Sequence, residues 1–318
     1  MGLASHGGAL WLEQDHPSCL QLLHAGKRVC ANRRACEGVT HLGVRIVFSD
    51  LDGTLLTYDK KLSRATRQML ENLTSRGIEF VPCSGRALSG LPKELLELPC
   101  CHYAVCSNGA AISESKTYRK LFQSYMGRDR ALALWKRVKG LDVSFDIFAD
   151  GKIWSERRAY ERLDSYGIDE QTLKSVKGCR TPTERTPEET LAWLAERGED
   201  VERVTLFWKT VEGRDAVIAA VAADPTLAWT NSVPHDIEVM DASVNKGAAL
   251  IWLCSHLGIP VSSSVAFGDG LNDAPLLAAA GVGVAMANAV PETKAAADAV
   301  TSSNDEDGVA RAMEKLLG

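Results

Sequence analysis

Two aspartates separated by a single residue, Asp50 and Asp52, end an apolar run that follows Arg45, and Gly53 comes directly after them. Such a run predicts a buried strand, so the pair is expected at the strand's carboxyl end, where open α/β sheets bind their ligands. Two neighbouring carboxylates repel each other unless a metal ion, a shared proton or a nearby cation compensates their charge. The spacing therefore indicates a site, although a turn-capping aspartate beside a solvated one would give the same local pattern.

Further polar residues stand at the ends of later apolar runs or at the start of a predicted helix, and in chain order they are Ser84, Lys246, Asp269, Asn272 and Asp273. Taken alone, a lysine at a helix start is usually solvated. Several carboxylates at one sheet edge suit Mg²⁺, a hard cation that binds carboxylates, waters and phosphate oxygens. A hydroxyl and an ammonium stabilise the oxygens of a phosphoryl group in transfer, one aspartate can attack phosphorus, and a second can move the proton. The set predicts phosphoryl transfer with Mg²⁺.

Strand-like and helix-like stretches alternate from Arg45 onward and position these residues. Apolar runs at 78–83 and 103–106 predict two further strands, and the segments between them carry apolar residues at helical spacing. Strand and helix in repeated order is the pattern of a parallel sheet with right-handed crossovers. The sequence therefore predicts an α/β fold in which the carboxyl ends of the strands share one edge.

The pattern changes over residues 113–232. Two apolar runs surround Asp150 and Gly151, which predicts a hairpin. Thr186 is followed by a proline and, three positions on, by a glutamate, which predicts a capped helix start. A segment of this length, with both strand-like and helix-like stretches, predicts a separate α+β domain inserted into the first. The first pattern is expected to resume with a strand at 236–240.

The composition excludes several classes of protein. At 318 residues the chain can bury two cores, and its formal net charge of −5 gives no basic footprint, so nucleic acid is not expected as a partner. The nine cysteines are scattered without CxxC spacing, which is typical of reduced thiols in a cytoplasmic protein. The longest run of small apolar residues is shorter than the roughly 20 residues that a bilayer requires, so no membrane partner is expected.

Residues 1–43 precede the first predicted strand and are assigned to no domain. Their apolar stretch is too short for a signal peptide, so secretion is not expected. Four basic residues, Lys27, Arg28, Arg33 and Arg34, could mark a targeting segment or an anion patch, but a solvated extension is the favoured interpretation. We expect this segment to be dispensable for catalysis.

Taken together, the motifs are similar to those of the haloacid dehalogenase (HAD) superfamily of phosphatases, and of its Cof-like group, which carries a large cap between the second and third motifs. The similar segments are D-L-D-G-T-L-L (50–56), S-G-R (84–86), S-N-G-A (107–110), N-K-G-A-A-L (245–250), F-G-D-G-L-N-D (267–273) and G-V-A-M-A-N-A (283–289). The resemblance covers residues 45–318. It implies a parallel Rossmann-like core sheet flanked by helices, at 44–112 and 233–318, with an inserted α+β cap domain at 113–232.

Position by position, the resemblance implies a role for each candidate residue. Asp50 resembles the nucleophile, and Asp52 resembles the general acid and base. Ser84 and Lys246 resemble the phosphate-binding pair, and Lys246 would also neutralise Asp50.

The resemblance also implies a Mg²⁺ site. Asp269 resembles a direct metal ligand, beside the carboxylate of Asp50 and the backbone carbonyl of Asp52. Asn272 resembles a position on the phosphate side, and Asp273 resembles a position next to the metal. The metal set is therefore expected to comprise these four aspartates.

Two sets of residues leave alternatives open. Turn or hinge chemistry and direct substrate contact are equally compatible with three loop residues, Arg86, Asn108 and Gly109. Three tryptophans could line a substrate pocket, but a place in the core is expected for Trp154, Trp193 and Trp208.

The function implied by the resemblance is Mg²⁺-dependent hydrolysis of a small phosphorylated metabolite, either a sugar phosphate or a phosphorylated cofactor, through an aspartyl-phosphate. A phosphomutase or phosphotransferase would use the same site and pass the phosphoryl group to a second substrate. A non-catalytic sugar-phosphate-binding protein would be expected to lack one of the carboxylates or the lysine, and this chain retains all of them. No oligomeric state is predicted.

Overall fold

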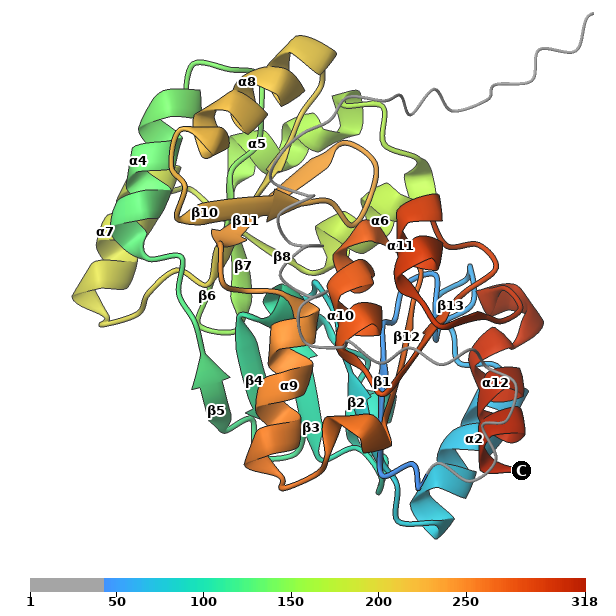
Figure 1. Cartoon of the computed structure of the whole chain (residues 1–318). Coiled ribbons are helices and arrows are strands. Elements are labelled where there is room, and N and C mark those ends of the chain that lie inside the picture. Colours follow the sequence, from blue (N-terminus) through green and yellow to red (C-terminus); the bar gives the residue numbers. More distant parts are fainter. Residues whose placement is uncertain (1–42) are drawn as a thin grey trace, which may run out of the picture.

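Five parallel strands form the first sheet, in the order β14-β13-β12-β1-β2 (Figure 1). The computed structural model describes residues 43–318, so the predictions for residues 1–42 lie outside the described part. The strands are β1 (Ile46–Ser49), β2 (Glu79–Pro82), β12 (Ser264–Gly268), β13 (Val282–Ala285) and β14 (Ala299–Val300). Ser49 lies opposite both Phe267 and Pro82, so β1, β12 and β2 end at the same edge. The predicted parallel α/β sheet is confirmed.

Helices flank this sheet, and their ends follow the chemistry of their sequences. α9 (Lys246–His256) packs on α10 (Ala274–Ala279), and α2 (Arg64–Ser75) packs on α12 (Gly308–Leu317) at the other side of the sheet (Figure 1). The shorter α3 (Lys93–Leu96) and α11 (Pro291–Ala296) complete the set. α2 begins where the backbone N–H of Thr66 donates to Ser63 Oγ, a typical N-cap.

A small antiparallel sheet adjoins the parallel one. It contains β3 (Tyr103–Cys106), β4 (Ala111–Glu114) and β5 (Lys120–Gln123) in that order. A parallel bridge between Cys83 and Val105 joins β3 to the end of β2, so the strand predicted at 103–106 is present but pairs mainly with β4. Ala111 and Ile112 pack into the same apolar cluster as β1 and β12.

The inserted domain is built on a six-stranded sheet with the order β10-β11-β9-β6-β7-β8. Its strands are β6 (Asp146–Ala149), β7 (Lys152–Glu156), β8 (Arg180–Thr183), β9 (Arg203–Phe207), β10 (Leu227–Thr230) and β11 (Asp236–Asp241). Its helices are α4 (Arg128–Val138), α5 (Arg157–Arg162), α6 (Glu170–Gly178), α7 (Pro187–Glu196) and α8 (Val211–Ala222). The predicted inserted α+β domain is therefore confirmed.

Both local predictions in this domain are also confirmed. β6 and β7 form an antiparallel hairpin around Asp150 and Gly151, whose φ angles of 53° and 66° are those that a tight primed turn requires. Thr186 and Glu189 form a complete capping box at the start of α7, with Pro187 at the first helical position.

One strand predicted for the parallel sheet lies elsewhere, so that prediction was wrong. β11 pairs antiparallel with β9 and β10 in the six-stranded sheet. The reason is its alternation: Ile237 and Val239 join an apolar cluster with α4, α7 and α8, whereas Asp236 and Glu238 point to the opposite face. Strands buried on both faces of a parallel sheet are instead nearly continuous apolar runs.

Backbone hydrogen bonds favour a division of the chain that differs from the predicted cap at 113–232. The N–H of Ser124 still donates to Ala110 near the parallel sheet, whereas the N–H of Met126 donates to Glu202 in the six-stranded sheet. We therefore propose that the inserted domain, called the cap below, spans residues 125–243. The remaining described residues are called the core.

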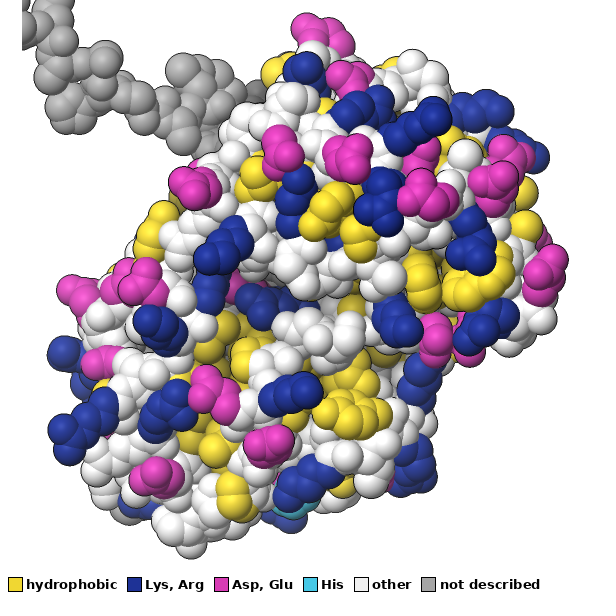
Figure 2. Space-filling model, turned by 180° about the vertical axis from the view of Figure 1, so that it is seen from behind, with side chains coloured by type: hydrophobic (Ala, Val, Ile, Leu, Met, Phe, Trp, Pro, Cys, Tyr) yellow, Lys and Arg dark blue, Asp and Glu magenta, His cyan; other side chains and the backbone are white. Residues whose placement is uncertain are grey.

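The surface carries mixed charge. On the face that Figure 2 shows, Lys and Arg side chains are interspersed with Asp and Glu. Within residues 43–318, no helix combines the length and the apolar character that crossing a membrane requires. The described cysteines are all free thiols: Cys83, Cys100, Cys101, Cys106, Cys179 and Cys254.

Candidate active site

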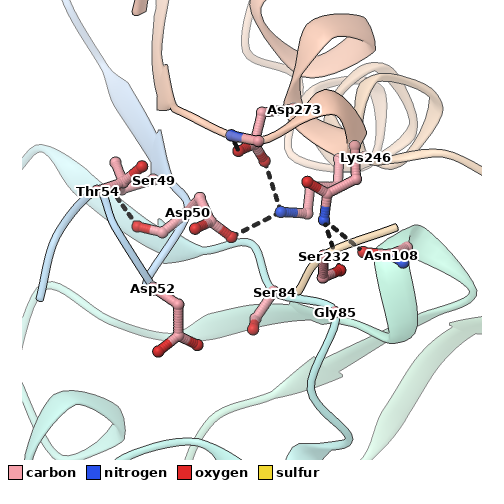
Figure 3. A network of polar contacts seen from close by, with 12 residues as sticks. Ser49, Asp50, Asp52, Thr54, Ser84, Gly85, Asn108, Ser232, Lys246 and Asp273 are labelled. Atoms are coloured by element: carbon pink, nitrogen blue, oxygen red, sulfur yellow. Dashed lines mark hydrogen bonds and ion pairs between the residues drawn. The ribbon is translucent and has the colours of Figure 1, made fainter. Parts of the chain in front are cut away.

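Asp50 and Lys246 form the centre of the site (Figure 3). Asp50 directly follows β1, and Lys246 is the first residue of α9, where Asn245 caps the helix. Lys246 Nζ lies 2.6 Å from Asp50 Oδ1 and 2.5 Å from Asp273 Oδ1, and the lysine has no solvent exposure. Burial alone would lower the pKa of Lys246, but Asp273 and Asp50 outweigh it and raise the pKa above its ordinary value. A lysine at a helix start is usually solvated, but Lys246 is buried and ion-paired in this fold.

Three carboxylates share this one lysine. Oxygens of Asp50, Asp269 and Asp273 all lie within 4.8 Å of one another. Burial raises the pKa of Asp50, which Lys246 only partly offsets. Burial and the neighbouring Asp273 also raise the pKa of Asp269, to about 7. The cluster therefore holds more negative charge than the lysine compensates, and a divalent cation with a preference for oxygen ligands fits it.

The loops hold these carboxylates in fixed positions. Thr54 Oγ1 donates to Asp269 Oδ1 at 2.6 Å. Asp273 Oδ2 accepts the backbone N–H groups of Asp269 and Gly270 at 3.0 and 2.9 Å. Both Asp273 oxygens are thus engaged, so this residue is better suited to orienting the cluster than to binding a metal directly. Gly53, at φ 83°, passes so close to Asp269 that an added Cβ would lie 2.4 Å from its Oδ2, so only glycine fits there.

Asp52 points away from Asp50 (Figure 3). Arg86 binds its carboxylate with both Nε and Nη2, at 2.9 and 2.8 Å, and Lys60 Nζ lies 2.9 Å from Oδ1. Burial alone would raise the pKa of Asp52, but the two cations outweigh it and lower the pKa. The sequence left the role of Arg86 open, although its position directly after the Ser-Gly pair at a strand end could have indicated a site residue. Nothing in the sequence indicated Lys60.

Ser84 and Asn272 line the cavity, and Asn108 contacts Asn272 beside it. Ser84 is 2 % exposed, and its Oγ accepts the N–H of Arg86 at 3.1 Å. Asn272 Nδ2 donates to Asn108 Oδ1 at 3.1 Å, and Asn108 Nδ2 donates to Glu238 of the cap. Asn108 therefore bridges the core and the cap.

The cavity lies between the core edge and one face of the cap sheet. It is lined by six of the predicted site residues, Asp50, Asp52, Ser84, Asp269, Asn272 and Asp273, and Lys246 lies against its wall. Cap residues that the sequence did not indicate also line it, among them Arg180, Arg203, Asp236 and Glu238. For Asp236 and Glu238 the available signal was the alternation of acidic and apolar residues in β11, whereas the Arg-Thr-Pro-Thr sequence of β8 gave no comparable signal for Arg180.

The three tryptophans do not line this cavity. Trp208 is buried, and Trp154 and Trp193 pack against the apolar cluster on the helix-covered face of the cap sheet. The prediction of a core position is confirmed for Trp208, whereas Trp154 and Trp193 are partly buried at the edge of the cluster.

The fold and the site together define a class of protein: an α/β protein with a carboxylate-rich site at the edge of a parallel sheet, beneath an inserted cap. The family model for haloacid dehalogenase-like hydrolases matches residues 47–313, and the chain belongs to this family. The resemblance drawn from the motifs is therefore confirmed.

Individual relatives agree with this assignment. The 5-amino-6-(5-phospho-D-ribitylamino)uracil phosphatase YwtE of Bacillus subtilis (strain 168) is 28% identical over 286 residues, which are 86% of this chain and 98% of that protein. The phosphatase YwpJ of the same organism is 28% identical over 297 residues, covering 86% of this chain and all of its own length (100%).

Solved structures share the fold. A haloacid dehalogenase-like hydrolase from B. subtilis aligns with a TM-score of 0.75 and 28% identity, over 85% of this chain and 99% of its own. The HAD subclass IIB sugar phosphatase BT4131 aligns with a TM-score of 0.71 and 23% identity, over 86% and 98%. Family membership and these relatives make the chain a phosphatase of the haloacid dehalogenase type.

Proposed function

We propose that the chain is a Mg²⁺-dependent hydrolase of small phosphorylated metabolites, with Asp50 as the nucleophile. The observation that carries this proposal is the buried contact of Lys246 with Asp50 and Asp273, next to Asp269. A fully buried lysine keeps one carboxylate oxygen of Asp50 in place, in a residue that lines the cavity. A carboxylate fixed in this way is suited to attack on phosphorus.

The carboxylate set supports Mg²⁺ as the cofactor. We propose that Asp50, Asp269 and the backbone carbonyl of Asp52 hold the ion, while Asp273 orients Asp269 and Lys246 through the contacts described above. When bound, Mg²⁺ would neutralise negative charge on the phosphoryl oxygens of the substrate.

The protein groups can account for both halves of the reaction. An oxygen of Asp50 attacks phosphorus, and the bond from phosphorus to the leaving oxygen breaks, which forms an aspartyl-phosphate. Ser84 and Lys246 stabilise the phosphoryl oxygens, and Asp52 donates a proton to the leaving oxygen. Asp52 then takes a proton from the attacking water, inorganic phosphate is released, and Asp50 is restored.

This role requires Asp52 to leave its partners. In the described conformation Arg86 and Lys60 hold its carboxylate ionised and turned from Asp50. We propose that the leaving oxygen of a bound substrate replaces part of this contact. Arg86 would then fix the starting position of Asp52, since it is itself anchored on the carbonyl of Gly90 at 2.9 Å.

A panel of phosphorylated metabolites tests the proposal. Phosphate release with Mg²⁺ is measured for the wild type and for Asp50→Asn, and the variant is expected to lose activity by about 10⁴-fold or more. The compound 5-amino-6-(5-phospho-D-ribitylamino)uracil belongs in the panel because two relatives carry its name. Wild-type rates in Asp50→Asn would refute the nucleophile, and release that required an acceptor other than water would favour a phosphotransferase.

A further inference from the structure

The cap face of the cavity carries two arginines, and both are already paired with carboxylates. They project from β8 and β9 toward the core edge, together with side chains of β6 and β11. On β6, β9 and β11 the residues that face the cavity alternate with residues of the cap's apolar cluster, as the two-residue period of a strand requires.

Arg203 is almost fully engaged within the protein. Its Nη1 lies 2.6 Å from Glu238 Oε1 and donates to Thr205 Oγ1 at 3.0 Å, and its Nη2 donates to the carbonyl of Gly85. The guanidinium also stacks 3.7 Å from the centre of the Phe148 ring. Only Nε lacks a partner, and it is buried.

Arg180 is engaged in the same manner. Its Nε lies 2.7 Å from Asp146 Oδ2, and its Nη1 donates to the carbonyl of Val176 at 2.5 Å. Ser155 Oγ donates to the other oxygen of Asp146 at 2.6 Å, so both carboxylate oxygens of Asp146 have a hydrogen-bond partner. Each arginine is therefore already ion-paired with a carboxylate of the cap, so an anion that enters the cavity would compete with that carboxylate for the guanidinium.

Asp236 differs from its neighbours because one of its oxygens is free. Oδ1 accepts the N–H groups of Ser232 and Val233 at 3.1 and 3.4 Å, whereas Oδ2 has no hydrogen-bond donor among residues 43–318. The residue is 5 % exposed and lines the cavity. Burial, and next the charge of Glu238, raise its pKa. Because Asp236 lines the cavity, a hydrogen-bond donor on a bound ligand can reach this oxygen.

We propose, resting on the phosphatase function proposed above, that the cap selects a leaving group without a second anionic group, one that donates a hydrogen bond from a hydroxyl or amine to Asp236. A carboxylate or second phosphate in this cavity would lose its hydration and meet only guanidinium groups that already bind a carboxylate, those of Arg86, Arg180 and Arg203. Such an uncompensated charge is strongly disfavoured in a buried site.

Matched pairs of substrates test this without any variant. Glucitol 6-phosphate and 6-phosphogluconate differ only in whether carbon 1 is a CH₂OH or a carboxylate; ribitol 5-phosphate with 5-phosphoribonate, and glycerol 3-phosphate with 3-phosphoglycerate, give the same contrast. The polyol member is expected to have a kcat/KM about tenfold or more above that of its anionic partner, a difference of about 1.4 kcal/mol.

The outcomes separate this inference from the proposed function. Equal or faster hydrolysis of the anionic members would overturn the inference alone. So would hydrolysis of p-nitrophenyl phosphate with no hydrolysis of any polyol phosphate. Absence of phosphate release from every phosphomonoester, p-nitrophenyl phosphate included, would overturn the proposed function instead.

An added cation provides a gain-of-function test. Ser175 on α6 lines the cavity and is partly exposed, so Ser175→Lys introduces an unpaired ammonium there. This variant should raise the relative kcat/KM for 6-phosphogluconate over glucitol 6-phosphate by about fivefold to tenfold. Ala133→Lys adds the same charge at an exposed position of α4 outside the cavity and should leave the ratio unchanged. An unchanged ratio in folded Ser175→Lys, or an equal change in Ala133→Lys, would contradict the inference.

Asp236→Asn tests the hydrogen bond itself. The amide retains an oxygen for the N–H groups of Ser232 and Val233 but presents NH₂ where the free carboxylate oxygen stood. We expect kcat/KM for glucitol 6-phosphate to fall by about tenfold, mainly through KM. Asp129→Asn makes the same change at an exposed cap position and should have no effect. No rise in KM for Asp236→Asn, with unfolding temperatures that match the wild type, would count against Asp236 as the contact.

Discussion

The core edge and the cap wall face each other across one cavity, and they differ in how their charged side chains are paired. At the core edge three carboxylates share a single lysine, so negative charge remains that a cation can compensate. At the cap wall each arginine is matched by its own carboxylate, and only Asp236 retains a free oxygen. The core edge is therefore arranged to bind an ion and a phosphoryl group, whereas the cap wall is arranged to accept a group that brings no further negative charge.

The two sides also differ in how the chain builds them. Core residues stand in loops just after parallel strands, so strands that are distant in sequence bring them to one edge. Cap residues stand inside antiparallel strands and reach the cavity because every second side chain points to that face. Core site residues are therefore held by contacts between loops and helix ends, whereas each cap wall residue belongs to the packing of one sheet.

Lys246→Met is expected to have the largest effect, because it removes the cation on which the core edge depends. Removing one partner of a buried ion pair costs about 3–5 kcal/mol of stability, and kcat for p-nitrophenyl phosphate should fall by about 10²–10³-fold. Steady-state kinetics and thermal unfolding measure the two effects. Lys315→Met, at an exposed site on α12, should retain activity and stability. A wild-type kcat in Lys246→Met would show that the core edge does not depend on this lysine for catalysis.

Arg86→Gln should have the next largest effect, since it alters the charge balance around Asp52. The pKa of Asp52 lies below its ordinary value because Arg86 and Lys60 outweigh burial, so loss of Arg86 should raise it. A general acid acts only when protonated, and its contribution disappears as pH rises through its pKa. The basic limb of kcat/KM for glycerol 3-phosphate should therefore move to higher pH.

A substrate with a good leaving group is the control for this experiment. The leaving group of p-nitrophenyl phosphate needs little protonation, so its pH profile should move less in Arg86→Gln than that of glycerol 3-phosphate. The loss of a paired, charge-assisted contact should also lower stability by about 1–3 kcal/mol. Equal displacement of both profiles would mean that Arg86 does not act through Asp52.

Asn108→Ala should have the smallest effect, and it tests the hydrogen bonds that connect the core edge to the cap. The substitution removes the contacts to Glu238 in the cap and Asn272 in the core, and it places alanine at φ 57°. We expect a loss of about 1–3 kcal/mol in stability and a few-fold rise in KM with kcat retained, since the chemistry stays in place. Asn72→Ala, at an exposed site on α2, is the control. A larger loss in kcat than in KM would show that Asn108 contributes to the chemistry.

Much of the core could be predicted because its information is local. A strand-type run followed by Asp50 and Asp52, and another followed by Asp269 and Asp273, can be recognised from adjacent residues, and the parallel sheet then requires them to meet. The strand at 236–240 was placed in the wrong sheet because a short apolar stretch shows that a strand exists but does not identify its partner. The alternation of Asp236, Ile237 and Glu238 is the pattern of a strand with one apolar and one polar face, as in an antiparallel sheet.

The sequence by itself determined the kinds of groups at the core edge, their order along the chain, and the presence of an inserted domain. The tertiary structure decided how those groups divide their charge. It buried Lys246 between Asp50 and Asp273, turned Asp52 toward Arg86 and Lys60, and brought the paired arginines of the cap over the cavity. The physical reason is that charge pairing and burial depend on contacts between strands and loops far apart in the chain, which residue types and local spacing do not specify.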